Sequence, residues 1–219
     1  MERNVQENYL KAIYKLSEKN KEGAYTNDIA SELNIKPSSV SEALKKLSEE
    51  HLIKYQKYKA ATLTEKGKLI ALMTIRKHRL WEVFLVEKLG FRWDEIHPMA
   101  EEMEHINFDE LTERLAKFLD NPTADPHGDP IPDKHGKIKA IKAKKLIEAK
   151  EKELVVMVGI ENHSPSFMKH LDNIGLSLGA HIVVKGLVDF DNSMLLSVNK
   201  SKDFYISREV AENVLVKES

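Results

Sequence analysis

The order of helical and strand-like periodicities in the first 64 residues restricts the fold of this chain more than any other feature. Three segments carry apolar residues at helical spacing: 4–17, 27–33 and the segment that opens at Pro37. Two short strand-like segments follow, 51–55 and 61–64, joined by the Lys-rich turn 56–60. Helix, short helix, turn, helix and basic β-hairpin, in this order, predict a winged helix-turn-helix domain.

The remaining chain changes from helical to strand-like periodicity. Helices are expected at about 65–88, 93–107 and 108–119, and the Pro-rich stretch 121–136 predicts a loop. Beyond Leu154, five short β-rich segments interrupted by a helix at 165–173 predict a small β-barrel. We therefore expect a mainly α protein with a small β part, divided into 1–72, 73–136, a linker at 137–153, and 154–219.

The composition excludes several classes of protein. There are no cysteines, so disulfides, thiolate zinc sites and cysteine nucleophiles are ruled out. No apolar run approaches the roughly 20 residues of a membrane helix, and the segment MERNVQENYLK lacks the apolar region of a signal peptide. These features predict a cytoplasmic protein that has no membrane partner.

The net charge of −1 conceals two segments of opposite sign. Residues 36–68 hold eight lysines and four glutamates, an excess of four positive charges. Residues 92–133 hold three basic and twelve acidic residues, an excess of nine negative charges. A basic segment can face a polyanion and an acidic one can face metal cations, although two solvated faces would have the same composition.

The third helix of the N-terminal domain predicts binding to a double-stranded DNA operator. Its start would enter the major groove, where serine and glutamate side chains reach base edges and lysines reach phosphates. The candidate DNA-binding residues on this helix and on the wing are Lys36, Pro37, Ser38, Ser39, Glu42, Lys45, Lys46, Lys57 and Lys59. The alternative is a winged helix used for protein contact, which the excess of positive charge disfavours.

A second constellation predicts metal binding. His97, Glu101 and His105 are spaced four residues apart with Glu104 beside them, so one helix would present all four on about one face. His78 and Glu82 repeat this spacing on the preceding helix. Imidazole and carboxylate donors without thiolates suit Mn²⁺, Fe²⁺ or Zn²⁺. The alternative, a solvated charged helix face, explains the clustering of histidines less well.

These residues resemble a known family. The segments IRKHRLWEVFLVEKLGF, EIHPMAEEMEHINFDELTERL and DPHGDPIP are similar to the diphtheria-toxin-repressor family of metal-dependent regulators, above all to its manganese-responsive members. The resemblance runs from about residue 4 to 136 and continues more weakly through the β-rich part. It implies a homodimer with an N-terminal winged helix, a helical metal-binding and dimerisation domain, and a C-terminal SH3-like domain of the FeoA-like type.

The resemblance also implies metal ligands. A regulatory site would use Asn8, Glu101, Glu104 and His105. An ancillary site would draw on His78, Glu82 and His97, with additions from Asp125 and His127 of the loop and from His163 of the C-terminal domain.

Three positions depart from the family pattern, and each has an oxygen donor. Position 101 is Glu where iron-sensing members have a sulfur ligand, and position 125 is Asp where related loops often have Cys. Position 8 is Asn where manganese sensors often have Asp and iron sensors have Met. Oxygen donors favour a hard cation, so the cofactor is expected to be Mn²⁺, with Fe²⁺ as the alternative.

The expected function is metal-dependent repression of metal-uptake genes, without enzymatic activity. The main alternative is a metal-independent winged-helix regulator that responds to an organic ligand. A metallohydrolase is disfavoured because no nucleophile motif accompanies the His/Glu cluster. A purely structural metal protein is disfavoured by the basic wing and recognition helix.

Overall fold

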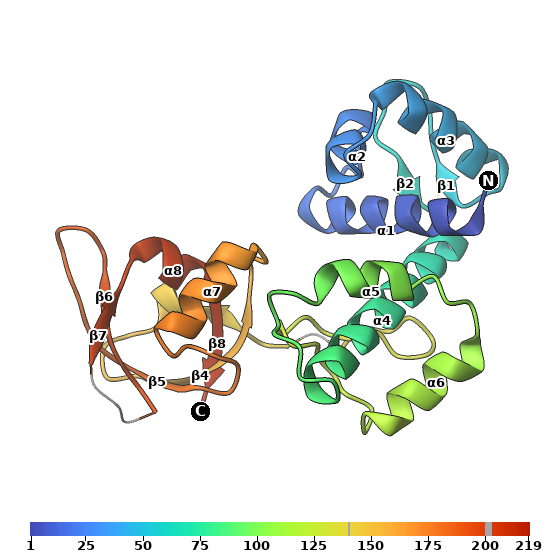
Figure 1. The fold of residues 1–219 in the computed structure, drawn as a ribbon. Coiled ribbons are helices and arrows are strands. Elements are labelled where there is room, and N and C mark those ends of the chain that lie inside the picture. The colour runs from blue at the N-terminus through green and yellow to red at the C-terminus, as the bar shows by residue number, and fades with distance from the viewer. Residues whose placement is uncertain (140, 200–202) are drawn as a thin grey trace. The chain divides into compact units, whose positions relative to one another are not determined.

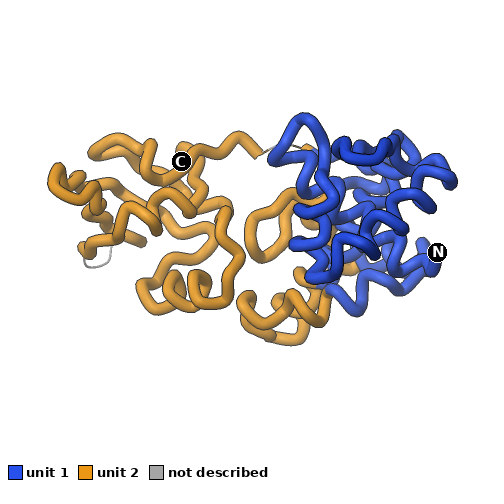
Figure 2. The backbone as a smooth tube through the Cα atoms, turned by 90° about the horizontal axis from the view of Figure 1, so that it is seen from above, with its two compact units in different colours: residues 1–81, 101–117, 132–138 blue, residues 82–100, 118–131, 139–219 orange. Residues whose placement is uncertain are grey.

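The computed structural model describes residues 1–139, 141–199 and 203–219. Residue 140 of the predicted linker and residues 200–202 of the predicted C-terminal domain lie outside the described residues. The chain forms two compact units, coloured separately in Figure 2. The first unit comprises 1–81, 101–117 and 132–138, and the second comprises 82–100, 118–131 and 139–219.

The N-terminal part of the first unit is a winged helix-turn-helix, as predicted (Figure 1). Its elements are α1 (Arg3–Lys19), α2 (Thr26–Glu32), α3 (Pro37–Glu49), β1 (Ile53–Lys54) and β2 (Thr62–Leu63). The two short strands pair antiparallel, with Ile53 opposite Leu63, and form the wing. Pro37 occupies the first turn of α3, where a missing N–H breaks no helical hydrogen bond.

One apolar core holds these elements together. Leu10 and Ile13 from α1 belong to the same core as Leu44 and Leu47 from α3, and the four side chains are fully buried. Each buried side chain of this size contributes about 1.5–3 kcal/mol relative to exposure. The opposite side of α1 is therefore free to carry polar residues.

Three further helices follow: α4 (Glu65–Glu87), α5 (His97–Met103) and α6 (Asp109–Phe118). The predicted helix over 93–107 was wrong at both ends. Pro98 explains the late start, because a proline inside a helix lacks its N–H and clashes with the carbonyl four residues earlier. At the other end, Ile106 N–H donates to the Met103 carbonyl in a turn that ends the helix. Glu104 and His105 therefore lie in a turn rather than on a helix face.

The C-terminal part of the second unit is an antiparallel sheet. Its described strands are β3 (Lys144–Lys145), β4 (Leu154–Ile160), β5 (His181–Leu187), β6 (Met194–Val198), β7 (Phe204–Ile206) and β8 (Val214–Glu218). They run in the order β3-β8-β4-β5-β6-β7. The short helices are η1 (Leu146–Glu148), α7 (Pro165–Asn173) and α8 (Arg208–Asn213).

The sequence predicted five of these strands and α7, but not β3, η1 or α8. Both β3 and η1 lie within the segment predicted as a linker, and Leu146 of η1 is fully buried in the core of the sheet. Ser164 caps α7 by accepting a hydrogen bond from the Phe167 N–H, and Ser207 caps α8 in the same way.

The Pro-rich loop is tied to β4 by backbone contacts within the second unit. The Ile160 N–H donates to the His127 carbonyl at 3.1 Å. Gly128 has φ +90°, and a Cβ added there would lie 2.1 Å from the Val158 carbonyl oxygen. Only glycine allows this close approach, so Gly128 holds the loop against the sheet.

Candidate metal centre

The polar side of α1 carries two buried charged residues. Glu7 and Lys11 are 2% and 6% exposed, and they lie one helical turn apart. Asn8 stands between them on the same helix. Buried charges are tolerated only where partners compensate the loss of water. The partners of these residues come from α1 itself, from α4, from α5 and from the turn after α5.

Glu7 is bound by three groups of the first unit. Its carboxylate accepts from His105 Nδ1 at 2.9 Å and from Arg3 Nε at 3.0 Å. The Lys77 ammonium lies 3.5 Å from Glu7 Oε1. Burial lowers the pKa of Lys77, and the negative charge of Glu7 opposes this shift. Glu7 therefore stabilises a buried lysine and orients a histidine.

The contact with Glu7 defines which His105 nitrogen is available to a ligand. A carboxylate only accepts hydrogen bonds, so Nδ1 of His105 carries the proton. In the neutral ring, the lone pair is then on Nε2, which lies 3.8 Å from Glu104 Oε1. Metal-binding histidines commonly donate their second ring N–H to a carboxylate in this way, and this hydrogen bond fixes the orientation of the ring.

Glu104 is completely buried and uses both of its oxygens. Oε1 accepts from Lys11 Nζ at 2.5 Å, and Oε2 lies 2.6 Å from His78 Nδ1. The same Lys11 ammonium donates to Glu101 Oε1 at 2.9 Å. Lys11 thus links the carboxylates of Glu101 and Glu104.

Asn8 supplies an oxygen with no protein partner. Its Oδ1 atom is buried, and no hydrogen-bond donor reaches it within the described parts of the chain. A buried polar atom normally has a partner, so this oxygen is suited to a bound cation. Together with the predicted ligands Glu101, Glu104 and His105, it would give a donor set of oxygens and one nitrogen, a chemistry that suits Mn²⁺ or Fe²⁺.

A second cluster lies within the second unit. Ligand atoms of Glu82, Asp125 and His127 lie within 4.8 Å of one another, and all three residues are buried. Asp125 Oδ1 accepts from the backbone N–H groups of His127 and Asp129, at 2.8 and 3.0 Å. The loop backbone therefore orients the aspartate.

A hydrogen bond from one ring nitrogen orients His127, just as the contact with Glu7 orients His105. His127 Nε2 donates to the Trp93 carbonyl at 2.8 Å, because a carbonyl oxygen only accepts. In the neutral ring, the lone pair is then on Nδ1, which lies 3.9 Å from Glu82 Oε2. Two carboxylates and one imidazole with fixed orientation suit a divalent cation.

Of the other predicted ancillary residues, His97 and His163 lie beside this cluster, and His78 does not. His97 Nδ1 lies 3.5 Å from Glu82 Oε1, and its side chain is 56% exposed. The His163 ring meets the His127 ring edge-on at 5.4 Å between centroids, and His163 Nε2 lies 3.6 Å from Asp129 Oδ2. His78 belongs to the first unit, where it contacts Glu104.

The predicted DNA-contacting residues are exposed, and they lie on α3 and on the wing formed by β1 and β2. The exposed residues are Lys36, Pro37, Ser38, Ser39, Glu42, Lys45, Lys46, Lys57 and Lys59. At the wing tip, Tyr58 is 88% exposed, and the Lys57 ammonium lies 4.9 Å from the centroid of its ring. This surface offers cations and hydroxyl groups to a polyanion.

The sequence analysis did not identify Glu7, Lys11 and Lys77, which surround the predicted ligands Glu101, Glu104 and His105. Glu7 and Lys11 are four residues apart on an amphipathic helix, which is the pattern of an ordinary solvated ion pair. Their burial depends on partners about ninety residues away, and nothing in the local pattern signals such partners.

Models of three known domains match this chain. Residues 3–61 match the iron dependent repressor N-terminal DNA binding domain, and residues 64–133 match its metal binding and dimerisation domain. Residues 144–218 match the FeoA domain. The iron-dependent repressor IdeR of Mycobacterium tuberculosis is 36% identical over 126 residues, which is 58% of this chain. The match spans 54% of IdeR, so the chain covers about half the length of such curated relatives.

Solved structures match over nearly the whole chain. A manganese-dependent transcriptional repressor in complex with manganese is 30% identical, with a TM-score of 0.84 over 98% of this chain and 100% of the other. ScaR with bound Cd²⁺ is 35% identical, with a TM-score of 0.75 over 98% and 99% of the two chains. Domain order, fold and sequence agree with the resemblance. The chain belongs to the diphtheria-toxin-repressor family of iron- and manganese-dependent transcriptional repressors.

Proposed function

We propose that this protein is a metal-dependent DNA-binding repressor of metal-uptake genes, which acts as a homodimer in the cytoplasm. The observation that carries the proposal is the partly buried cluster of carboxylates and imidazoles against α1, a helix of the winged-helix domain. Among the described residues, no helix has the length and apolar character that crossing a membrane requires.

The regulatory ligands in this proposal are Asn8, Glu101, Glu104 and His105. They fit a divalent cation because Asn8 Oδ1 has no partner among the described residues and because the orientation of His105 points Nε2 toward Glu104. A bound cation supplies the positive charge that joins an oxygen of α1 to donors at the end of α5. Mn²⁺ is the preferred cation, with Fe²⁺ as the alternative, because oxygen donors predominate and thiolates are absent.

The ancillary ligands are Glu82, Asp125 and His127, with His97 and His163 beside them. Their support is the burial of the three central residues and the fixed orientation of the His127 ring. The loop that carries Asp125 and His127 also binds β4 through its backbone. A cation here would therefore strengthen the attachment of this loop. His78 was expected at the ancillary site, but its contact with Glu104 favours a place at the regulatory site.

The helix α1 connects the regulatory cluster to the DNA-reading surface. Its apolar residues Leu10 and Ile13 belong to the same buried core as Leu44 and Leu47 of α3. Its polar residues Glu7 and Lys11 contact Glu101, Glu104 and His105. Holding α1 therefore holds the recognition helix. In a symmetric dimer, the two recognition helices must match half-sites roughly 34–36 Å apart, so the metal can select the DNA-competent arrangement without touching DNA.

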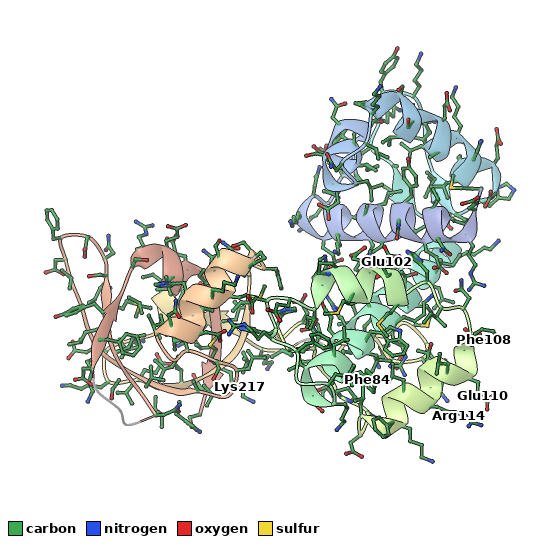
Figure 3. The ribbon with its side chains drawn as sticks, viewed as in Figure 1. Phe84, Glu102, Phe108, Glu110, Arg114 and Lys217 are labelled. Carbon is green, nitrogen blue, oxygen red and sulfur yellow. The ribbon has the colours of Figure 1, made fainter. Side chains whose placement is uncertain are left out.

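An exposed part of the helical domain is available to a second copy of the chain. Phe108 is 71% exposed and Leu111 is 39% exposed at the start of α6. Figure 3 shows Phe108 projecting from this end of the helix, with Glu110 and Arg114 on its outer side. Apolar residues in this setting are typical of a protein–protein contact.

A DNA-binding titration tests the proposal. The labelled DNA would be promoter fragments of the host's manganese-uptake genes, titrated with chelator, with Mn²⁺, and with Fe²⁺ without oxygen, at one fixed salt concentration. We expect tight binding only with metal. Equal binding in chelator would contradict the proposal and favour the regulator that responds to an organic ligand.

A matched pair of variants tests the regulatory ligands. Asn8→Ala should weaken metal-dependent binding at limiting Mn²⁺, because it removes the unpartnered oxygen. Asn4→Ala, an exposed position on the same helix, should leave binding unchanged. Equal DNA binding by the two variants would exclude Asn8 as a ligand.

A further inference from the structure

We propose that Lys11 is an internal competing cation of the regulatory site: its ammonium group occupies the Glu101–Glu104 carboxylate pair, and a divalent cation must displace it. Lys11 would thereby set the affinity of the site for metal. This inference rests on the proposed regulatory site and adds to it a residue that determines affinity without being a ligand.

The position of the ammonium carries the argument. Lys11 Nζ lies 2.5 Å from Glu104 Oε1 and 2.9 Å from Glu101 Oε1, and only 8% of its side chain is exposed. His78 already contacts the other oxygen of Glu104. The oxygen that Lys11 holds is thus the one that also lies 3.8 Å from His105 Nε2. Lys11 is therefore bound where the carboxylates and imidazole of the proposed ligand set converge.

Two cations compete for these oxygens. A divalent cation binds carboxylate lone pairs directly, and the same lone pairs accept the Lys11 hydrogen bonds. An ammonium left beside a bound cation would also repel it, strongly so in a buried place of low dielectric. Lysine can leave without backbone movement, because its long flexible chain carries a compact charge.

The lysine has a second effect in the metal-free protein. Glu104 is fully buried, and Glu101 is bridged to it by Lys11. Without a cation, the two carboxylates would lose their shared donor and repel each other. Lys11 thus stabilises the metal-free fold while it weakens metal binding. Lys77 does not replace it, because the Lys77 ammonium lies against a different carboxylate, Glu7, at 3.5 Å.

The test measures Mn²⁺ binding by the full chain without DNA, using isothermal titration calorimetry and thermal unfolding. Lys11→Met removes the charge and keeps the chain length, and Lys11→Gln keeps a hydrogen-bond donor should the first variant fold poorly. Lys19→Met, an exposed position on the same helix, is the control. The titration is repeated in an Asp125→Asn background, which removes a carboxylate from the Glu82–Asp125–His127 cluster. Mn²⁺ binding at the regulatory site is then measured separately from binding at that cluster.

We expect Lys11→Met and Lys11→Gln to bind Mn²⁺ on the order of 10- to 100-fold more tightly than the wild type, since two charge-assisted competing hydrogen bonds are lost. Their midpoint of unfolding should fall without metal and rise further with metal than that of the wild type. Lys19→Met should match the wild type in both measurements.

Two outcomes separate the inference from the function on which it rests. If the wild type binds Mn²⁺ and the Lys11 variants bind it equally or more weakly, Lys11 orients the carboxylates for metal and the competition is refuted. If the wild type binds neither Mn²⁺ nor Fe²⁺, the proposed regulatory site itself is refuted, and the inference falls with it.

Discussion

Replacing Glu7 by Gln should weaken both the fold and metal binding, because this one carboxylate supports two different groups. Its side chain is 3% exposed and accepts from His105 Nδ1 at 2.9 Å. The same carboxylate lies 3.5 Å from the ammonium of Lys77, whose side chain is 11% exposed. Gln preserves the shape of the side chain and removes its charge.

The magnitude has two parts. For the fold, the loss of one partner of a buried ion pair costs about 3–5 kcal/mol in full. The amide retains some hydrogen bonding, so we expect about 2–4 kcal/mol. For metal binding, loss of the carboxylate behind a ligating histidine typically reduces affinity about 10- to 100-fold.

Urea unfolding of the metal-free protein measures the first part, and calorimetric titration with Mn²⁺ measures the second. Arg3→Gln is the matched control, because it removes the 63%-exposed partner of the same carboxylate. A surface pair of this kind is worth about 0–1 kcal/mol. If Glu7→Gln and Arg3→Gln give the same stability and the same affinity, the assigned support of His105 and Lys77 by Glu7 is refuted.

Three further changes test other parts of the molecule. Gly128→Ala should detach the Pro-rich loop from the sheet, because the added Cβ would lie 2.1 Å from the Val158 carbonyl oxygen. Amide hydrogen exchange in the loop should become faster, and unchanged exchange would contradict this prediction. A hydrogen bond from Lys144 holds the pKa of Glu153 below its ordinary value of 4.5, so this pair should stabilise the fold at neutral pH and cease to do so as the pH falls through the lowered pKa. Glu153→Gln should remove that part of the acid sensitivity in urea unfolding between pH 7 and about pH 3, and an unchanged profile would exclude it. Leu44→Ala should cost about 2–5 kcal/mol in the same measurement at pH 7, since the side chain is fully buried in the winged-helix core; a loss under 1 kcal/mol would contradict that packing.

The winged helix could be predicted from the sequence because its signals are local. Apolar spacing, Pro37 and the short basic hairpin each depend on neighbours within a few residues. The β-rich segments of the C-terminal domain were predictable for the same reason. The short strand β3 was not, because Lys144–Lys145 has no strand-like pattern and pairs with β8 only through the tertiary fold.

The candidate metal residues were predicted by a combination of spacing and family resemblance, and one part of the spacing argument was wrong. His97, Glu101, Glu104 and His105 do not share one continuous helix, because α5 ends at Met103. The residue types still indicated metal binding correctly as a class of chemistry, since oxygen and imidazole donors without cysteine suit hard cations. Their roles as individual ligands remain predictions.

The sequence by itself determined the order of the domains, the exposed basic recognition helix and the absence of thiolate ligands. These properties depend on residue types and on short-range periodicity. Only the tertiary structure decided that Glu7 and Lys11 are buried and that Lys11 bridges two acidic side chains. Their contacts with Glu101, Glu104 and His105 join residues 90 to 98 positions apart along the chain, and the fold brings them together. The electrostatic environment of a charge depends on which groups surround it in space, and a local sequence pattern does not contain that information.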